Sequence, residues 1–243
     1  MTALLQVEGL SKGFGGVRAV DDCSFGVSEG TMTALIGPNG SGKTTVFNLV
    51  TGYLSADAGV VRFAGAPVRS PDPMRLYRLG LTRTFQQARV FARLSVRDNL
   101  IAAIPHRRRS FLRTRFTPAD MSRAEEVLGE FGLLGLADAL ASELSFGQRK
   151  LLEFATVLMS RPRLVLLDEP TSGVNPTMVA TMERHIRELN AQGLTFLIVE
   201  HDMNLVMRLC DPVIVLDHGA KIMEGAPSEV QVDPRVLDAY LGA

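Results

Sequence analysis

The sequence predicts an α/β fold in which a largely parallel sheet carries a helical insertion. Short β-rich runs recur along the chain, with helical stretches between several of them. Apolar runs such as "LVLL" and "FLIV" do not alternate with polar residues, which is typical of strands buried on both faces of a parallel sheet. The predicted strands are residues 4–10, 31–37, 59–65, 163–169, 194–200 and 212–219.

The β signal fades between about residues 87 and 160, where helical patterns replace it. Within this region Thr117 is a predicted N-cap, with Pro118 at the first helical position. A further helix is predicted over residues 176–192, because apolar residues follow its opening proline at three- to four-residue spacing. We therefore expect one domain, residues 1–243, with a helical subdomain at approximately residues 87–160.

Composition excludes several classes of protein. The 243 residues are 46% hydrophobic and carry 26 Lys and Arg against 26 Asp and Glu, so the basic footprint of a nucleic-acid-binding protein is missing and no nucleic acid is expected as a partner. Cys23 and Cys210 lie far apart and are predicted to be reduced packing residues. A chain without a disulfide framework is typical of a cytoplasmic protein. It has neither a recognisable secretion signal nor an apolar run near the ~18 residues of a membrane span, so it is not expected to cross or be exported through a membrane by its own sequence.

Residues 37–44, "GPNGSGKT", form a complete phosphate-loop motif between a predicted strand and a predicted helix. Glycines let backbone N–H groups converge on phosphate oxygens, and the helix N-terminus adds partial positive charge. Lys43 is predicted to contact the β- and γ-phosphates, and Thr44 to offer its hydroxyl to Mg²⁺. The ligand is predicted to be a nucleoside triphosphate with Mg²⁺, and a glycine-rich helix cap is the alternative. The predicted nucleotide-binding residues are Gly37, Asn39, Gly40, Ser41, Gly42, Lys43, Thr44 and Thr45.

Two carboxylates follow the apolar run "LVLL" at the end of a predicted strand. Asp168 is predicted to hold Mg²⁺, as an acidic residue at this place does in phosphate-loop enzymes. Glu169 should point to the other side of the pleat, where it can act as general base on an attacking water. Together with the phosphate loop, the pair predicts hydrolysis of the nucleotide.

The stretch "LSFGQ", residues 144–148, resembles the LSGGQ signature of ATP-binding cassette (ABC) ATPases, with Phe146 in place of the first glycine. The resemblance implies an α/β phosphate-loop fold, ATP as the nucleotide, and nucleotide contacts from Ser145, Gly147 and Gln148. The same residues are also consistent with a simple helix cap.

Other family motifs occur in the expected order. Phe14 matches the aromatic residue that stacks on adenine, although it can also be a packing residue. Gln86 matches the glutamine that senses Mg²⁺ and the attacking water, with Gln87 as the alternative. His201 matches the histidine that contacts the γ-phosphate. The loop "SGVN" departs from the usual SALD, and its Asn175 is also a candidate N-cap.

The resemblance also implies partners. In the family two cassettes face head to tail, and each ATP lies between the phosphate loop of one and the signature of the other. A second ATPase subunit, identical or paralogous, is therefore expected. Transmembrane permease subunits would dock near the signature region, and a substrate-binding protein would act through them. The expected location is the cytoplasmic face of the inner membrane.

Three stretches narrow the resemblance to ATPases of branched-chain amino acid importers: residues 80–100, 172–176 and 225–243. Urea importers, lipopolysaccharide exporters and ABC ATPases outside transport are the alternatives. The chain does not touch the transported substrate, so site chemistry does not decide among them. Five arginines between residues 107 and 115 are expected either on a solvated loop or against anionic lipid.

Overall fold

The computed structural model describes residues 3–68, 72–85, 90–104 and 117–241. Its larger sheet has six strands, and the neighbours from β9 to β6 are parallel while β10 is antiparallel to β9. In spatial order the strands are β10 (Ala220–Gly225), β9 (Val213–Asp217), β3 (Met32–Ile36), β8 (Thr195–Val199), β7 (Leu164–Asp168) and β6 (Leu81–Arg83). The predicted α/β class and largely parallel sheet are confirmed.

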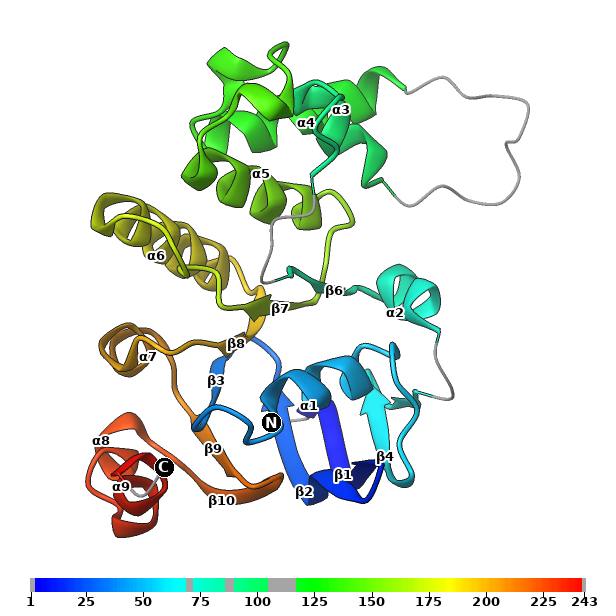
Figure 1. Ribbon diagram of the computed structural model, residues 1–243. Helices are drawn as coiled ribbons and strands as arrows, with labels where there is room; N and C mark the ends of the chain where they lie inside the picture. Colours follow the sequence, from blue (N-terminus) through cyan, green and yellow to red (C-terminus); the bar gives the residue numbers. More distant parts are fainter. Residues whose placement is uncertain (1–2, 69–71, 86–89, 105–116, 242–243) are drawn as a thin grey trace.

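A second sheet of four antiparallel strands lies beside the first (Figure 1). Its order is β2 (Val17–Ser28), β1 (Ala3–Phe14), β4 (Ala58–Phe63) and β5 (Ala66–Pro67). Two of the predicted strands, 4–10 and 59–65, belong to this sheet. Strand β2 was not predicted because two aspartates and a glycine interrupt its apolar pattern. Its extended backbone is stabilised instead by its long antiparallel pairing with β1.

The helices are α1 (Lys43–Val50), α2 (Pro73–Leu79), α3 (Val96–Ala102), α4 (Pro118–Glu130), α5 (Phe146–Leu158), α6 (Pro176–Ala191), α7 (Met203–Leu209), α8 (Pro227–Val230) and α9 (Pro234–Leu241), with single 3-10 turns at Leu134–Leu136 and Ala141–Glu143. The predicted caps are confirmed: Thr117 accepts a hydrogen bond from the Asp120 N–H, and Asn175 accepts one from the Met178 N–H. Helices α3, α4 and α5 form a layer above the strands in Figure 1, between β6 and β7 in the chain.

Both faces of the parallel sheet are buried, as its unbroken apolar runs predict. Val165 and Leu167 of β7 pack toward one hydrophobic cluster, whereas Leu164 and Leu166 pack toward another. The first cluster contains α5 and the second contains α1, so these two helices lie on opposite faces of the sheet.

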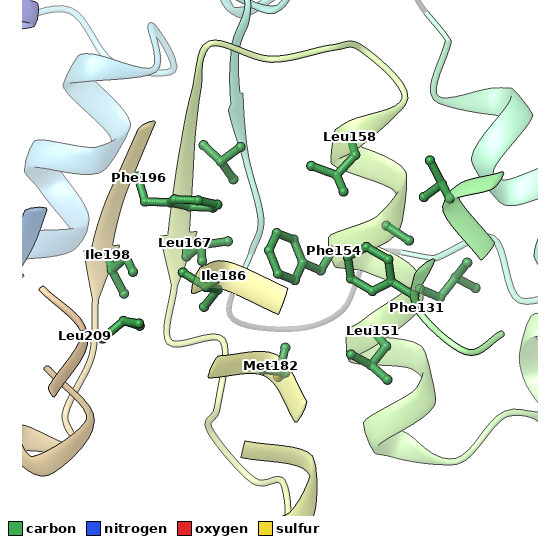
Figure 2. Close-up of a cluster of buried hydrophobic side chains, with 14 of the residues drawn as sticks. Phe131, Leu151, Phe154, Leu158, Leu167, Met182, Ile186, Phe196, Ile198 and Leu209 are labelled. Carbon is green, nitrogen blue, oxygen red and sulfur yellow. The ribbon is translucent and has the colours of Figure 1, made fainter. Parts of the chain in front are cut away.

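Aromatic rings connect the helical layer to the sheet. Figure 2 shows Phe131 beside Phe154, with Phe154 facing Phe196 of β8. The ring centroids are 5.3 Å apart in the first pair and 6.3 Å in the second, and both pairs meet edge to face. Each fully buried phenylalanine contributes about 1.5–3 kcal/mol of hydrophobic stabilisation. The α5 helix is therefore held firmly against the core.

The two cysteines are packing residues, as predicted. Cys23 and Cys210 are buried free thiols, and burial raises their pKa values to about 11 and about 12 respectively. Both thiols are therefore protonated and unreactive at neutral pH. Among the described residues, no helix combines the length and apolar composition needed to cross a bilayer.

Candidate active site

The phosphate loop, Asp168, Glu169 and His201 gather at the carboxyl ends of three parallel strands. The phosphate loop follows β3, Asp168 ends β7, and His201 stands two residues beyond the end of β8. Strand β8 pairs in parallel with both β3 and β7, so these three strand ends meet at one edge of the sheet. This edge is where open α/β sheets bind ligands.

The phosphate loop depends on glycine at two close approaches of the backbone. A Cβ on Gly37 would lie 2.1 Å from the Leu216 carbonyl oxygen, and one on Gly42 would lie 2.3 Å from the Ala19 carbonyl oxygen. Gly42 also has a φ of 100° and is the residue from which α1 begins. The loop therefore closes tightly against neighbouring backbone, with no room for a side chain at Gly37 or Gly42.

Within the loop, Asn39, Gly40 and Thr44 are exposed, whereas Ser41 is buried and Thr45 is half-buried. Lys43 opens α1, and its Nζ donates to the carbonyl oxygens of Gly37 and Pro38, each at 2.8 Å. Burial lowers the pKa of Lys43, and the nearby Glu169 and Asp168 carboxylates act in the opposite direction. A phosphate can offer this ammonium charged acceptors in place of neutral carbonyls.

Asp168 is almost completely buried and forms an ion pair that the sequence analysis missed. Its Oδ2 accepts a hydrogen bond from Arg83 Nη2 at 2.6 Å, and its backbone N–H donates to Thr84 Oγ1. Arg83 ends the short strand β6, next to β7. The signal that could have identified it is weak: in "GLTRTF" a threonine stands on each side of the arginine, with a leucine and a phenylalanine beyond them, and a buried arginine needs an acidic partner.

Glu169 and His201 contact one another directly. Glu169 Oε1 lies 2.7 Å from His201 Nε2, and the histidine side chain is 46% exposed. The argument from the strand pleat does not apply to Glu169. This residue follows the last residue of β7, and its φ of 47° is left-handed, so strand alternation does not set the direction of its side chain.

A second missed residue, Glu200, holds the loops that carry Glu169 and His201. Its Oε1 accepts hydrogen bonds from the N–H and hydroxyl of Thr171 at 2.9 and 2.6 Å, while its Oε2 accepts from the His201 N–H at 3.1 Å. Because Glu200 is buried and bonded on both sides, the loops after β7 and β8 are fixed relative to one another. The acid directly before the histidine in "VEHD" was the available signal.

The signature stretch begins α5 as a capping box. Ser145 Oγ accepts from the Gln148 N–H at 3.3 Å, and Gln148 Oε1 accepts from the Ser145 N–H at 2.9 Å. The interpretation as a helix cap is therefore confirmed. Gly147 lies against Met178 at the start of α6, because a Cβ there would meet the Met178 Cε at 2.9 Å.

The structure does not place the signature beside the phosphate loop. Helices α5 and α1 pack on opposite faces of the sheet, so Ser145 and Lys43 belong to separate surfaces of one chain. Phe14 is 47% exposed at the end of β1, with the Lys12 ammonium 5.6 Å from its ring centroid. Gln86 and Gln87 lie outside the described residues, as do the arginines between residues 107 and 115.

Comparisons with known proteins agree on one family. Residues 20–172 match the family described as ABC transporter, and residues 220–243 match that of the branched-chain amino acid ATP-binding cassette transporter. The chain is 37% identical to the high-affinity branched-chain amino acid transport ATP-binding protein BraF of Pseudomonas aeruginosa, with 98% of each protein covered. It is 35% identical to LivG of Escherichia coli, which carries the same description, again with 98% of each covered.

Solved structures of similar proteins have the same fold. A nucleotide-free ATP-binding cassette from an ABC transporter aligns over 100% of both chains with a TM-score of 0.89 and 34% identity. The ADP conformation of an ATP-binding cassette of an ABC transporter also aligns over 100% of both chains, with a TM-score of 0.89 and 35% identity.

Proposed function

Because this chain belongs to the ABC transporter family, we propose that it is the ATP-hydrolysing subunit of an importer of branched-chain amino acids. The observation that carries the ATPase is the meeting of Lys43, Asp168 and the Glu169–His201 pair at the ends of β3, β7 and β8. The substrate class is supported by relatives with 35–37% identity over 98% of both chains, whose descriptions name branched-chain amino acid transport.

The phosphate loop binds the triphosphate of ATP. Its backbone N–H groups and the N-terminus of α1 contact phosphate oxygens, and Lys43 moves its hydrogen bonds from loop carbonyls to the β- and γ-phosphates. Phe14 presents an exposed ring for adenine, since stacking needs only an accessible π-face.

Thr44 and Asp168 fit a Mg²⁺ ion carried in with the nucleotide. Thr44 offers an exposed hydroxyl, and Asp168 offers a carboxylate that Arg83 already holds by an ion pair. Across the residues described, no group of three or more His, Cys, Asp or Glu could hold a metal alone. Mg²⁺ typically takes one or two protein oxygens together with substrate phosphates and water, so this small donor set is suitable. When bound, Mg²⁺ neutralises charge that develops on the phosphates.

Hydrolysis is assigned to Glu169 and His201. Glu169 accepts a proton from the attacking water, and His201 contacts the γ-phosphate from the loop after β8. Their hydrogen bond and the Glu200 bridge between their loops hold the two side chains ready for these roles. We keep the role predicted for Gln86, which is to sense Mg²⁺ and the attacking water.

A complete site requires a second ATPase subunit. Because α1 and α5 lie on opposite faces of one chain, Ser145, Gly147 and Gln148 contact the ATP bound by the other subunit. That subunit is a second copy or a paralogue. Closure around ATP and reopening after hydrolysis then drive the transporter between states.

Permease subunits dock on the helical subdomain at approximately residues 87–160 and on the groove beside it. This groove has a volume of about 520 Å³ between α2, β6 and the end of α3, and its lining includes Met74, Tyr77, Phe85 and Ile104. Met74 is 57% exposed, so apolar surface is available to a partner helix. The chain is thereby held at the cytoplasmic face of the membrane, and a substrate-binding protein acts through the permeases.

Replacing Ser145 with arginine is expected to prevent closure of the ATP-bound dimer while leaving ATP binding by one chain intact. The larger cation occupies space that the partner's triphosphate needs. Light scattering in ATP, in a Glu169→Gln background, measures the dimer, and titration with a fluorescent ATP analogue measures binding. If that background does not dimerise alone, the partner is a paralogue, and ATP turnover of the intact transporter replaces light scattering.

Two controls separate this effect from damage to α5. Ser145→Ala removes the cap, at a cost of about 0.5–2 kcal/mol, but adds no bulk. Ser142→Arg adds the same cation at another exposed serine, three residues earlier. A Ser145→Arg protein that still closes normally would contradict the contact between subunits.

Uptake of labelled leucine tests the proposed substrate. Source cells that lack this gene should lose uptake, and the wild-type gene should restore it, whereas Glu169→Gln should not. Unchanged leucine uptake in the deletion strain would refute the amino acid assignment and direct the same assay to urea and lipid export.

A further inference from the structure

Arg83 occupies a buried position between three parts of the site, and the family resemblance assigned it no role. Its side chain is 6% exposed and that of Asp168 is 9% exposed, with 2.6 Å between Nη2 and Oδ2. The other terminal nitrogen, Nη1, donates to Asn48 Oδ1 of α1 at 2.7 Å. The guanidinium therefore joins the end of β7 to the helix that follows the phosphate loop.

Aromatic rings fix the same guanidinium further. Its Cζ lies 5.3 Å from the ring centroid of Phe47 and 5.2 Å from that of Phe85, which are within the range of cation–π attraction. The Phe85 N–H in turn donates to Glu153 Oε1 of α5 at 3.0 Å. Arg83 is thus held by two hydrogen-bond acceptors and two rings, and it has little freedom to move.

We propose that Arg83 is a positioning residue of the ATPase reaction, which holds the Asp168 carboxylate in the orientation that receives nucleotide-bound Mg²⁺. The proposal rests on the ATPase function proposed above. With Oδ2 bonded to Arg83, the carboxylate cannot turn freely, and Oδ1 is the oxygen that this ion pair leaves for the metal's water shell. Arg83 does not touch the nucleotide and acts through Asp168.

A general rule and one observation indicate that stability alone is not the reason for the ion pair. A buried ion pair often stabilises a protein no more than apolar residues of the same volume. In addition, Arg83 Nε is buried with no hydrogen-bond partner within the part of the chain that the structure describes, which is an energetic cost. Lys43, another nearby cation, bonds loop carbonyls, whereas Arg83 bonds the Asp168 carboxylate directly.

The test compares Mg²⁺ dependence with metal-free nucleotide binding in the full chain. Arg83→Gln is expected to raise the Mg²⁺ concentration for half-maximal ATPase activity about tenfold or more, as loss of a residue that orients a metal ligand usually does. ADP affinity measured in EDTA should stay unchanged, while the gain in ADP affinity on adding Mg²⁺ should fall. Arg83→Lys should recover part of that gain, because lysine keeps the charge without the planar fork.

Arg163→Gln is the matched control, since Arg163 is an exposed arginine paired with Glu29 just before the other end of β7. It should behave as wild type. If Arg83→Gln does not fold, Asn48→Ala tests the same contact more gently, because it removes one support of Arg83 and keeps the ion pair. A smaller shift in Mg²⁺ dependence in the same direction is expected there.

Unchanged Mg²⁺ dependence in a folded Arg83→Gln would overturn the proposal, as would unchanged Mg²⁺ dependence in Asn48→Ala if Arg83→Gln does not fold. So would an equal loss of ADP affinity with and without Mg²⁺, since that would indicate general damage to the site. A wild-type protein that neither binds nor hydrolyses ATP would instead refute the ATPase function, so the two failures are distinguishable.

Discussion

Replacing Glu169 with glutamine is expected to slow ATP hydrolysis by about 10²–10⁴-fold, the range for loss of a general base. Glutamine has nearly the same size, and its amide can still form a hydrogen bond with His201 where Glu169 Oε1 lies 2.7 Å from Nε2. The amide cannot accept a proton from water. ATP binding should therefore survive, and closed ATP-bound dimers should accumulate.

Phosphate release at saturating ATP measures the first effect, and titration with a fluorescent ATP analogue measures the second. Glu188→Gln is the matched control, because Glu188 is an exposed glutamate of α6 that pairs with Arg184. Wild-type turnover by Glu169→Gln would show that another group acts as base. Loss of ATP binding in the same variant would show that Glu169 supports the nucleotide rather than the water.

Replacing Lys43 with alanine is expected to weaken nucleotide binding by about 100-fold or more, since charge-assisted hydrogen bonds to the phosphates are lost. The fold should remain intact. Lys43 is buried, and its ammonium bonds loop oxygens. Burial lowers its pKa, so the charge contributes little to folding.

Isothermal calorimetry with ATP measures the affinity, and thermal unfolding without nucleotide measures the fold. Lys221→Ala serves as control, because Lys221 is a surface lysine of β10 paired with Glu224. Micromolar ATP affinity in Lys43→Ala would argue against the phosphate-loop role. A large drop in melting temperature without nucleotide would show that the lysine is needed for the fold itself.

Local patterns predicted much of the secondary structure. The caps at Thr117 and Asn175 and the helix from Pro176 depend on residues a few positions apart in the sequence. These contacts do not require a particular tertiary arrangement. Buried strands such as β7 and β8 were predicted because both of their faces are apolar. In each case the pattern that predicts the element lies within one short stretch of sequence.

The features that the sequence analysis missed depend on contacts between residues far apart in the sequence. Strand β2 carries a weak apolar pattern, and its pairing with β1 organises it. The direction of Glu169 depends on a left-handed backbone just past the strand, which no periodicity encodes. Arg83 and Glu200 became functional candidates only when folding brought them to Asp168 and Thr171, 85 and 29 residues away.

By itself the sequence determined the α/β class, the phosphate loop, the two carboxylates at the end of β7 and the resemblance to ABC ATPases, because each depends on patterns of consecutive residues. Only the tertiary structure decided that Glu169 meets His201, that Arg83 holds Asp168, and that α1 and α5 lie on opposite faces of the sheet. The physical reason is that charge pairing and burial depend on which strand ends and helices become neighbours. These neighbours are determined only when the whole chain folds.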